Sequence, residues 1–195
     1  MDAALRASFW GRLRRVYTAM DAAYGQSAAA YGFACGGCEE SCCRTRFHHH
    51  TLLEYLGLRE GLGGLPAGQQ EQIRDQAAAV VGQHARDLAA GTDTKPMCPL
   101  NAAGRCGLYA HRPMICRLHG IPHELHPPGR APQLGPGCAE FYRLCGRAVY
   151  HPFDRTLLYA ELARLESEFQ QAIGPPRRKI RMTIAEMLLD EGVLS

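Results

Sequence analysis

Nine cysteines in a chain of 195 residues are the feature that most limits what this sequence can fold into. Four lie within one short segment, Cys35-Gly-Gly-Cys38-Glu-Glu-Ser-Cys42-Cys43, and the others follow singly at 98, 106, 116, 138 and 145. The N-terminus lacks the uninterrupted apolar core of a signal peptide, and no stretch approaches the roughly 18–20 apolar residues of a membrane span. We therefore expect a cytoplasmic protein with no membrane partner, in which such cysteines indicate metal binding before disulfides.

The composition is typical of an ordinary globular protein. Hydrophobic residues make up 46% and charged residues 21% of the chain, whose length suffices for one domain with a hydrophobic core. The net charge of +3 comes from 22 Lys+Arg against 19 Asp+Glu. This small excess, with one short basic run at 175–181, gives no clear indication of nucleic-acid binding. We predict a single domain over 1–195, with a cysteine-cluster core at about 35–140.

Apolar periodicity predicts helices on both sides of that core. In the N-terminal segment 1–31, apolar residues recur every three or four positions and so line one helix face. These residues are Leu5, Phe9, Leu13, Val16 and Met20. Further helices are expected at about 45–58 and 66–90, the second with a stripe of Ile73, Ala77, Val80, His84 and Leu88.

C-terminal helices are expected over 154–192. The first carries an apolar stripe of Leu158, Leu162, Leu165 and Phe169 and ends before Gly174. Thr183 and Glu186 fit a capping box at the start of the second, and Gly192 fits its end.

Residues 91–151 differ from the rest of the chain. They hold much of its Pro, Gly and His and show no sustained period of two or 3.6 residues. Long irregular stretches inside compact domains are uncommon unless they are functional or disordered, and a chelated metal could supply the missing ordering free energy. The predicted fold class is therefore mainly α: a small helical domain with a long irregular Cys/Pro/Gly-rich loop region organised around a metal centre.

The spacing of the first four cysteines suits chelation. Cys35 and Cys38 are two residues apart, which is a usual half-site of Cys₄ zinc and many iron–sulfur centres, and the glycines between them allow a tight turn. Cys42 and Cys43 are adjacent, and adjacent side chains tend to point in different directions. They either serve two sites or include only one ligand, and the distal cysteines must complete any tetrahedral set.

The combined pattern resembles the YkgJ-type cysteine-cluster family, which is thought to chelate zinc or iron. The motifs that carry this resemblance are Cys35-x2-Cys38-x3-Cys42-Cys43, Cys98-Pro99-Leu100, Cys106-x2-Tyr109-x2-Arg112-Pro113-x2-Cys116-Arg117 and finally Cys138. The resemblance covers about residues 35–140. It implies metal ligation by Cys35, Cys38, Cys42, Cys43, Cys98, Cys106, Cys116 and Cys138.

This sequence departs from the family pattern at one point. Three residues separate Cys38 from Cys42 where many members have two, which could change which of Cys42 and Cys43 faces the centre. A similar cysteine pattern occurs in flagellin lysine methylases, and this raises an enzymatic alternative. Cys145 lies outside the pattern, and we expect it to be a small buried residue of a helix-like stretch.

The arrangement of single cysteines favours an iron–sulfur cluster over zinc. Zinc Cys₄ sites usually come as paired knuckles, whereas a cluster collects thiols from several segments. A mononuclear iron site is a third option. Among the nine histidines, His119 is the best alternate ligand because it lies three residues from Cys116, although solvation or hydrogen bonding is the expected role of each.

The sequence therefore predicts a metal-binding protein that holds an iron–sulfur cluster or zinc through clustered cysteines, with a redox role as one option. Two alternatives stay open: a zinc-stabilised module that binds a partner protein, and a metal-dependent, methyltransferase-like enzyme. Whether the protein is an enzyme at all is left undecided.

Overall fold

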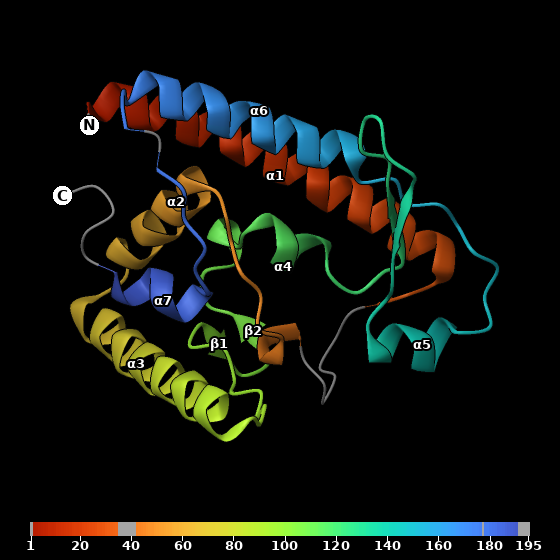
Figure 1. Ribbon diagram of the computed structural model, residues 1–195, viewed down its shortest axis with the longest axis horizontal. Helices are drawn as coiled ribbons and strands as arrows, with labels where there is room; N and C mark the ends of the chain where they lie inside the picture. The colour runs from red at the N-terminus through yellow and green to blue at the C-terminus, as the bar shows by residue number, and fades with distance from the viewer. Residues whose placement is uncertain (1, 35–41, 177, 191–195) are drawn as a thin grey trace. The chain divides into compact units, whose positions relative to one another are not determined.

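The computed structural model describes residues 2–34, 42–176 and 178–190, and this part of the chain is mainly helical, as predicted (Figure 1). The chain groups into two compact units. Unit 1 comprises residues 1–42 and 114–173, and unit 2 comprises residues 43–113 and 174–195. The single domain expected from the sequence stays a prediction.

Unit 1 is built on two long helices that lie side by side, α1 (Ala3–Tyr31) and α6 (Thr156–Ala172) (Figure 1). Their buried stripes include Phe9, Leu13, Val16 and Met20 of α1 and Leu162, Leu165 and Phe169 of α6. The Phe9 and Phe169 rings meet edge to face with centroids 5.2 Å apart. Burying a side chain of this size contributes about 1.5–3 kcal/mol to the free energy of unfolding. The packing of the two predicted stripes therefore holds α1 and α6 together.

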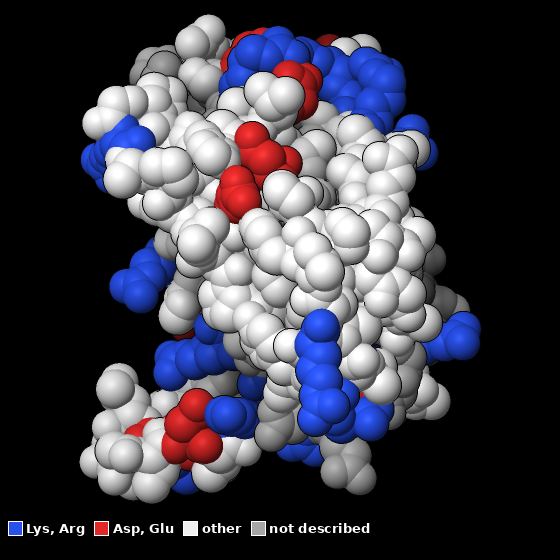
Figure 2. Space-filling model, turned by 90° about the vertical axis from the view of Figure 1, so that its right-hand side faces the viewer, with Lys and Arg blue, Asp and Glu red and all other residues white. Residues whose placement is uncertain are grey.

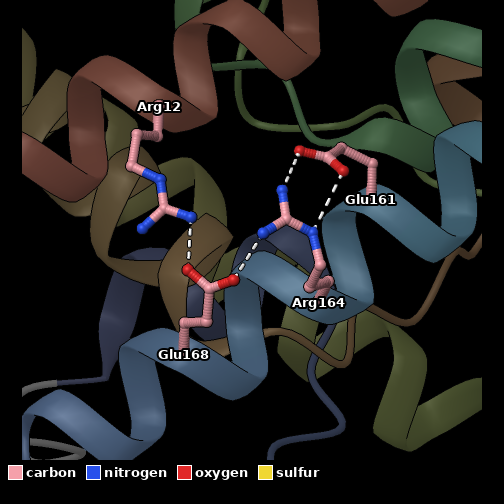
Figure 3. A network of polar contacts seen from close by, with 4 residues as sticks. All are labelled: Arg12, Glu161, Arg164 and Glu168. Carbon is pink, nitrogen blue, oxygen red and sulfur yellow. Dashed lines mark hydrogen bonds and ion pairs between the residues drawn. The ribbon is translucent and has the colours of Figure 1, made fainter.

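A network of ion pairs on α6 reaches α1 through one pair, Arg12–Glu168 (Figure 3). Arg12 of α1 pairs with Glu168 of α6, and Glu168 also accepts a hydrogen bond from Arg164 at 2.5 Å. Arg164 reaches back to Glu161 through two hydrogen bonds of 2.6 and 3.3 Å. Because all four side chains are partly exposed, water screens their charges. The network therefore contributes little to the free energy of unfolding.

Short elements complete unit 1. They are α4 (Met114–Leu118), β3 (His123–Leu125), β4 (Gln133–Gly135) and α5 (Ala139–Cys145). Arg117 holds α4 to α1: its guanidinium pairs with Asp21 at 2.6 Å and lies over the Tyr17 ring at 4.0 Å. With only 3% of its side chain exposed, Arg117 needs this acidic partner.

Unit 2 is built on α2 (Leu52–Gly63), α3 (Ala67–Ala90) and α7 (Ile184–Leu189), with α7 packed against both of the others. Its smaller elements are the 3₁₀ helix η2 (Tyr109–His111) and the strands β1 (Asn101–Ala102) and β2 (Arg105–Cys106). The predicted capping box is confirmed, because the Thr183 hydroxyl accepts from the Glu186 N–H and the Glu186 carboxylate accepts from the Thr183 N–H. The expected helix end at Gly192 is wrong, because α7 ends at Leu189 and Asp190 is already extended; Gly192 itself lies outside the described residues.

The helix predicted at 45–58 is wrong in its first half. Only the 3₁₀ helix η1 (Cys42–Arg44) precedes it, and α2 begins at Leu52. The intervening backbone pairs with a distant segment: the His49 N–H donates to Met182 at 2.8 Å, and the Met182 N–H donates back at 3.1 Å. This pairing satisfies backbone groups that a helix would otherwise use.

The stripe predicted for α3 fails in its last turn. Leu88 is 78% exposed, whereas Asp87 is buried. The Asp87 carboxylate accepts hydrogen bonds from Thr94, at 2.9 Å from the hydroxyl and 3.1 Å from the N–H, and from Gln83 at 2.7 Å. The helix thus turns this carboxylate inward to fix the segment that follows Gly91, which ends α3 in a left-handed conformation.

The region 91–151 is less irregular than predicted, since it contains β1, β2, η2, α4, β3, β4 and α5. These elements are too short to give a periodic pattern in the sequence. Cys145 ends α5 and is half-buried rather than part of the core, with its Sγ 3.5 Å from the Tyr31 carbonyl oxygen. Within the described ranges, no helix combines the length and the apolar character that crossing a membrane requires.

Candidate metal centre

Six of the eight cysteines predicted as ligands lie in the described part of the chain, and Cys35 and Cys38 lie outside it. The six divide evenly between the units: Cys43, Cys98 and Cys106 belong to unit 2, and Cys42, Cys116 and Cys138 belong to unit 1. All six are half-buried. The cysteines of the described ranges are all free thiols.

Backbone hydrogen bonds position the thiols of unit 2. The Cys98 N–H donates to the Cys43 carbonyl oxygen at 2.8 Å, and the Cys98 carbonyl accepts from the Asn101 N–H at 2.9 Å. The second bond closes a tight turn that leads into β1, where Asn101 lies opposite Cys106 of β2. Three cysteines from separate parts of the sequence are therefore gathered around one small hairpin.

The hairpin turn itself has an unusual backbone. Ala103 and Gly104 both have positive φ, of 51° and 83°, which is the pattern of a two-residue type I′ turn. The Asn101 side chain accepts from the Gly104 N–H at 3.1 Å and supports this turn. The Asn-x-x-Gly sequence is thus the local reason why the chain reverses between Cys98 and Cys106.

The surroundings of Cys98 disfavour the thiolate form of its side chain. Its pKa is raised to about 12, mainly because the thiol is buried. The Leu100 N–H opposes this rise by hydrogen-bonding to the thiolate, and charge on Cys43 and Cys106 adds to it. A cation reverses this balance, because it stabilises thiolates and releases their protons on binding.

In unit 1, Cys138 caps α5. Its Sγ accepts from the Phe141 N–H at 3.4 Å, and its own N–H donates to the Gly120 carbonyl at 2.9 Å. A Cβ built on Gly120 would lie 3.7 Å from this Sγ and 3.0 Å from the Tyr24 hydroxyl. Gly120, with φ of +117°, therefore allows the turn after α4, the helix of Cys116, to come close to Cys138.

The thiols do not form a closed metal site in the described part of the chain. Within it, no group of three or more His, Cys, Asp or Glu side chains is placed to hold one ion. The donor set nevertheless suits a soft or borderline metal, because every predicted ligand is a thiol. In a complete site, the sulfur atoms of Cys43, Cys98 and Cys106 would all have to face one metal position.

The histidines behave mostly as side chains of the fold. Burial and then the neighbouring Arg155 lower the pKa of His119, the predicted alternate ligand. Of the consecutive His48, His49 and His50, the middle one is 1% exposed and neither of its ring nitrogens has a hydrogen-bond partner. Burial, followed by charge on His50 and His48, lowers the pKa of His49 to about 4.

Arg112 makes local contacts in the turn between Cys106 and Cys116. Its guanidinium stacks on the Tyr109 ring at 4.4 Å and donates to the Tyr109 hydroxyl at 3.4 Å. Arg155 was not singled out from the sequence, although it is the most unusual charged side chain of unit 1. In the sequence, Arg155 is a charged residue between Phe153 and the apolar stripe of α6. That position does not indicate that the Arg155 side chain is buried.

Comparison of the chain with protein-family models, with curated proteins and with solved structures finds no match. The YkgJ-type resemblance thus stands on the cysteine motifs alone. On the face drawn in Figure 2 the surface is mostly uncharged, and basic side chains lie in separate groups, in keeping with the small net charge of +3.

Proposed function

We propose that this protein binds metal through its clustered cysteines, as an iron–sulfur cluster or as zinc, and that it belongs to the YkgJ-type cysteine-cluster family. The observation that carries the proposal is the gathering of Cys43, Cys98 and Cys106 at one hairpin of unit 2, where a backbone N–H already points at the Cys98 sulfur. N–H groups directed at sulfur are a recurring means of stabilising metal-bound thiolates.

Metal binding would change the protonation of these thiols. The raised pKa of Cys98 means that this thiol is protonated at neutral pH in the absence of a metal. A metal would displace the proton and neutralise the mutual repulsion of three thiolates.

We favour iron–sulfur over zinc because the thiols come from several separate segments. Cys43 ends the first cysteine segment, Cys98 precedes β1 and Cys106 lies in β2, so no second Cys-x2-Cys knuckle is formed. A cluster is larger than a single ion and can collect ligands from such a set. A cluster would also give the protein a redox function.

The test is metal and sulfide analysis with a visible absorption spectrum, on protein purified without oxygen. Iron with sulfide and a brown colour would establish a cluster, whereas colourless protein with stoichiometric zinc would favour the interaction-module alternative. Well-folded protein without either metal would overturn the proposal.

A matched pair of variants locates the site. We expect Cys106→Ser to lose metal, because serine replaces a thiolate by a weak ligand. Cys145→Ser should retain it, because Cys145 lies outside the motif and contacts the Tyr31 carbonyl, to which a serine hydroxyl can also donate. Equal metal content in the two variants would contradict the assignment.

A further inference from the structure

Arg155 of unit 1 is a buried cation without an acidic partner in the described ranges. It is 4% exposed, and its Nε has no hydrogen-bond partner. One Nη donates to the Ile121 carbonyl oxygen at 3.0 Å, the side chain hydrogen-bonds to Tyr159, and the guanidinium lies 4.8 Å from the centre of the Phe153 ring. Burial lowers the pKa of Arg155 to about 10, and the opposing contributions come from Tyr159 and Tyr24 rather than from a carboxylate.

The acidic groups nearest in sequence and strand pairing are engaged elsewhere. Glu124 shares a backbone bridge with this segment, but its carboxylate accepts from Tyr150 and contacts His126, each at 2.8 Å. The Asp154 carboxylate accepts from the N–H and hydroxyl of Thr156, at 2.8 and 2.5 Å. Neither acid neutralises Arg155, and burying an uncompensated charge is costly.

Two imidazoles, those of His119 and His123, flank Ile121, whose carbonyl oxygen accepts from Arg155. Burial lowers the pKa of His119 and of His123, and the Arg155 charge is the next cause for both. His123 Nδ1 is buried without a hydrogen-bond partner. Its ring is held against Gly135, where an added Cβ would lie 2.1 Å from a ring carbon, so the backbone of β4 fixes the position of the imidazole.

These observations describe a site in which the Arg155 Nε–H is an unused donor for one kind of ligand. A guanidinium with a spare Nε–H binds carboxylate and phosphate oxygens well, and an imidazole N–H can add a further hydrogen bond. The half-buried His119 and His123 are the more exposed members of the cluster, and Arg155 lies deepest. An oxyanion entering beside the histidines would supply the missing counter-charge.

We propose that Arg155, His119 and His123 form a binding site for a small oxyanion, a carboxylate or a phosphate, in unit 1. The proposal does not rest on the metal centre. It assigns a function to the one buried guanidinium in the described residues of unit 1 that lacks an acidic partner, since Arg117, which is similarly buried, is paired with Asp21.

The test is a calorimetric titration of the protein as purified with inorganic phosphate and, separately, with acetate, at fixed ionic strength and in buffer free of other oxyanions. We expect saturable binding of at least one of them, and the preferred anion identifies the class of ligand. Arg155→Lys should weaken binding tenfold or more, because lysine keeps the charge but lacks the Nε–H and the planar fork. His123→Gln should weaken it by a smaller factor.

Arg147→Gln serves as the matched control, because Arg147 is an exposed arginine of the same unit. It should bind the anion like the unchanged protein. The proposal is overturned if neither anion binds saturably, or if Arg155→Lys and Arg147→Gln bind equally well. Circular dichroism of each variant verifies that it is folded, and His123→Gln provides an independent test should Arg155→Lys unfold.

Discussion

At the scale of single residues, His49 shows how burial links one side chain to the stability of the chain. Its imidazole is 1% exposed with both nitrogens unpartnered, while its backbone pairs with Met182. Its pKa is lowered to about 4 in the folded protein, against 6.5 for an ordinary histidine. The unfolded chain therefore binds a proton more readily than the folded chain between these two values.

From this difference we predict that the free energy of unfolding falls as the pH is lowered. The contribution of His49 is fully present above pH 6.5 and is lost progressively toward pH 4, by roughly 2 kcal/mol between pH 7 and pH 5. His49→Leu should remove this part of the pH dependence, whereas His50→Gln, at an exposed position, should keep most of it. Urea unfolding of the three proteins at both pH values measures the difference, and equal slopes for all three would show that His49 does not titrate in this way.

At the scale of elements, α2 contains two glycines with opposite surroundings. A Cβ on Gly61 would lie 2.6 Å from the His111 ring, which hydrogen-bonds to the Gly57 carbonyl at 2.7 Å. A Cβ on Gly63 would meet nothing within 4 Å. Gly61 is thus required where η2 approaches α2, and Gly63 is not.

We predict that Gly61→Ala lowers the free energy of unfolding by about 1–3 kcal/mol, because it forces the His111 ring out of its place. Gly63→Ala should leave it unchanged or raise it by up to about 1 kcal/mol, since alanine favours the helix. Denaturant unfolding of both variants checks this, and a loss of the same size in both would show that His111 does not constrain the position.

The β1–β2 turn gives a second prediction at this scale. Ala103 adopts φ of 51°, a left-handed conformation that glycine reaches without strain. Ala103→Gly should raise the free energy of unfolding by about 0.5–1 kcal/mol, whereas Ala102→Gly, in the adjacent strand, should lower it by about as much. Denaturant unfolding of both variants tests this prediction. If both changes stabilise the protein, the left-handed conformation of Ala103 is not the cause of the stabilisation.

The elements also show which parts of the fold the sequence could predict. α1, α3 and α6 are long, and their apolar stripes or caps mark them clearly. The error at 45–51 arose because the pairing of His49 with Met182 joins residues 133 positions apart, which local periodicity cannot reveal. Leu88 was misplaced because the burial of Asp87 depends on hydrogen bonds from the segment after the helix.

The same reasoning applies to the candidate site. The spacing of the cysteines predicted which of them form the candidate ligand set. The structure places three of these at one hairpin. The spacing predicted that the adjacent Cys42 and Cys43 side chains point in different directions. It did not predict that the two residues belong to different units. Arg155 escaped notice because its burial follows from the packing of Tyr24, Phe153 and Tyr159 around it.

At the scale of the whole molecule, the cysteines fall into two groups that follow the division into units. Each unit holds three described cysteines of the motif. Within unit 2 the Cys98 N–H donates to the Cys43 carbonyl oxygen, and within unit 1 the Cys138 N–H donates to the Gly120 carbonyl oxygen. We predict from this grouping that the proposed metal binding uses one centre in each unit. The adjacent Cys42 and Cys43 would then serve different centres, which is one of the two options left open by their spacing.

Two centres predict a stepwise loss of metal. Cys98→Ser should remove the metal bound by unit 2 and leave that of unit 1, whereas Cys138→Ser should do the reverse. The fold of α5 should survive in Cys138→Ser, because serine is a good helix N-cap and can accept from the Phe141 N–H. Metal content per chain, measured for each single variant and for the double variant, should fall in two additive steps. Loss of all metal from either single variant, with its circular dichroism unchanged, would instead mean that one centre depends on both groups of thiols.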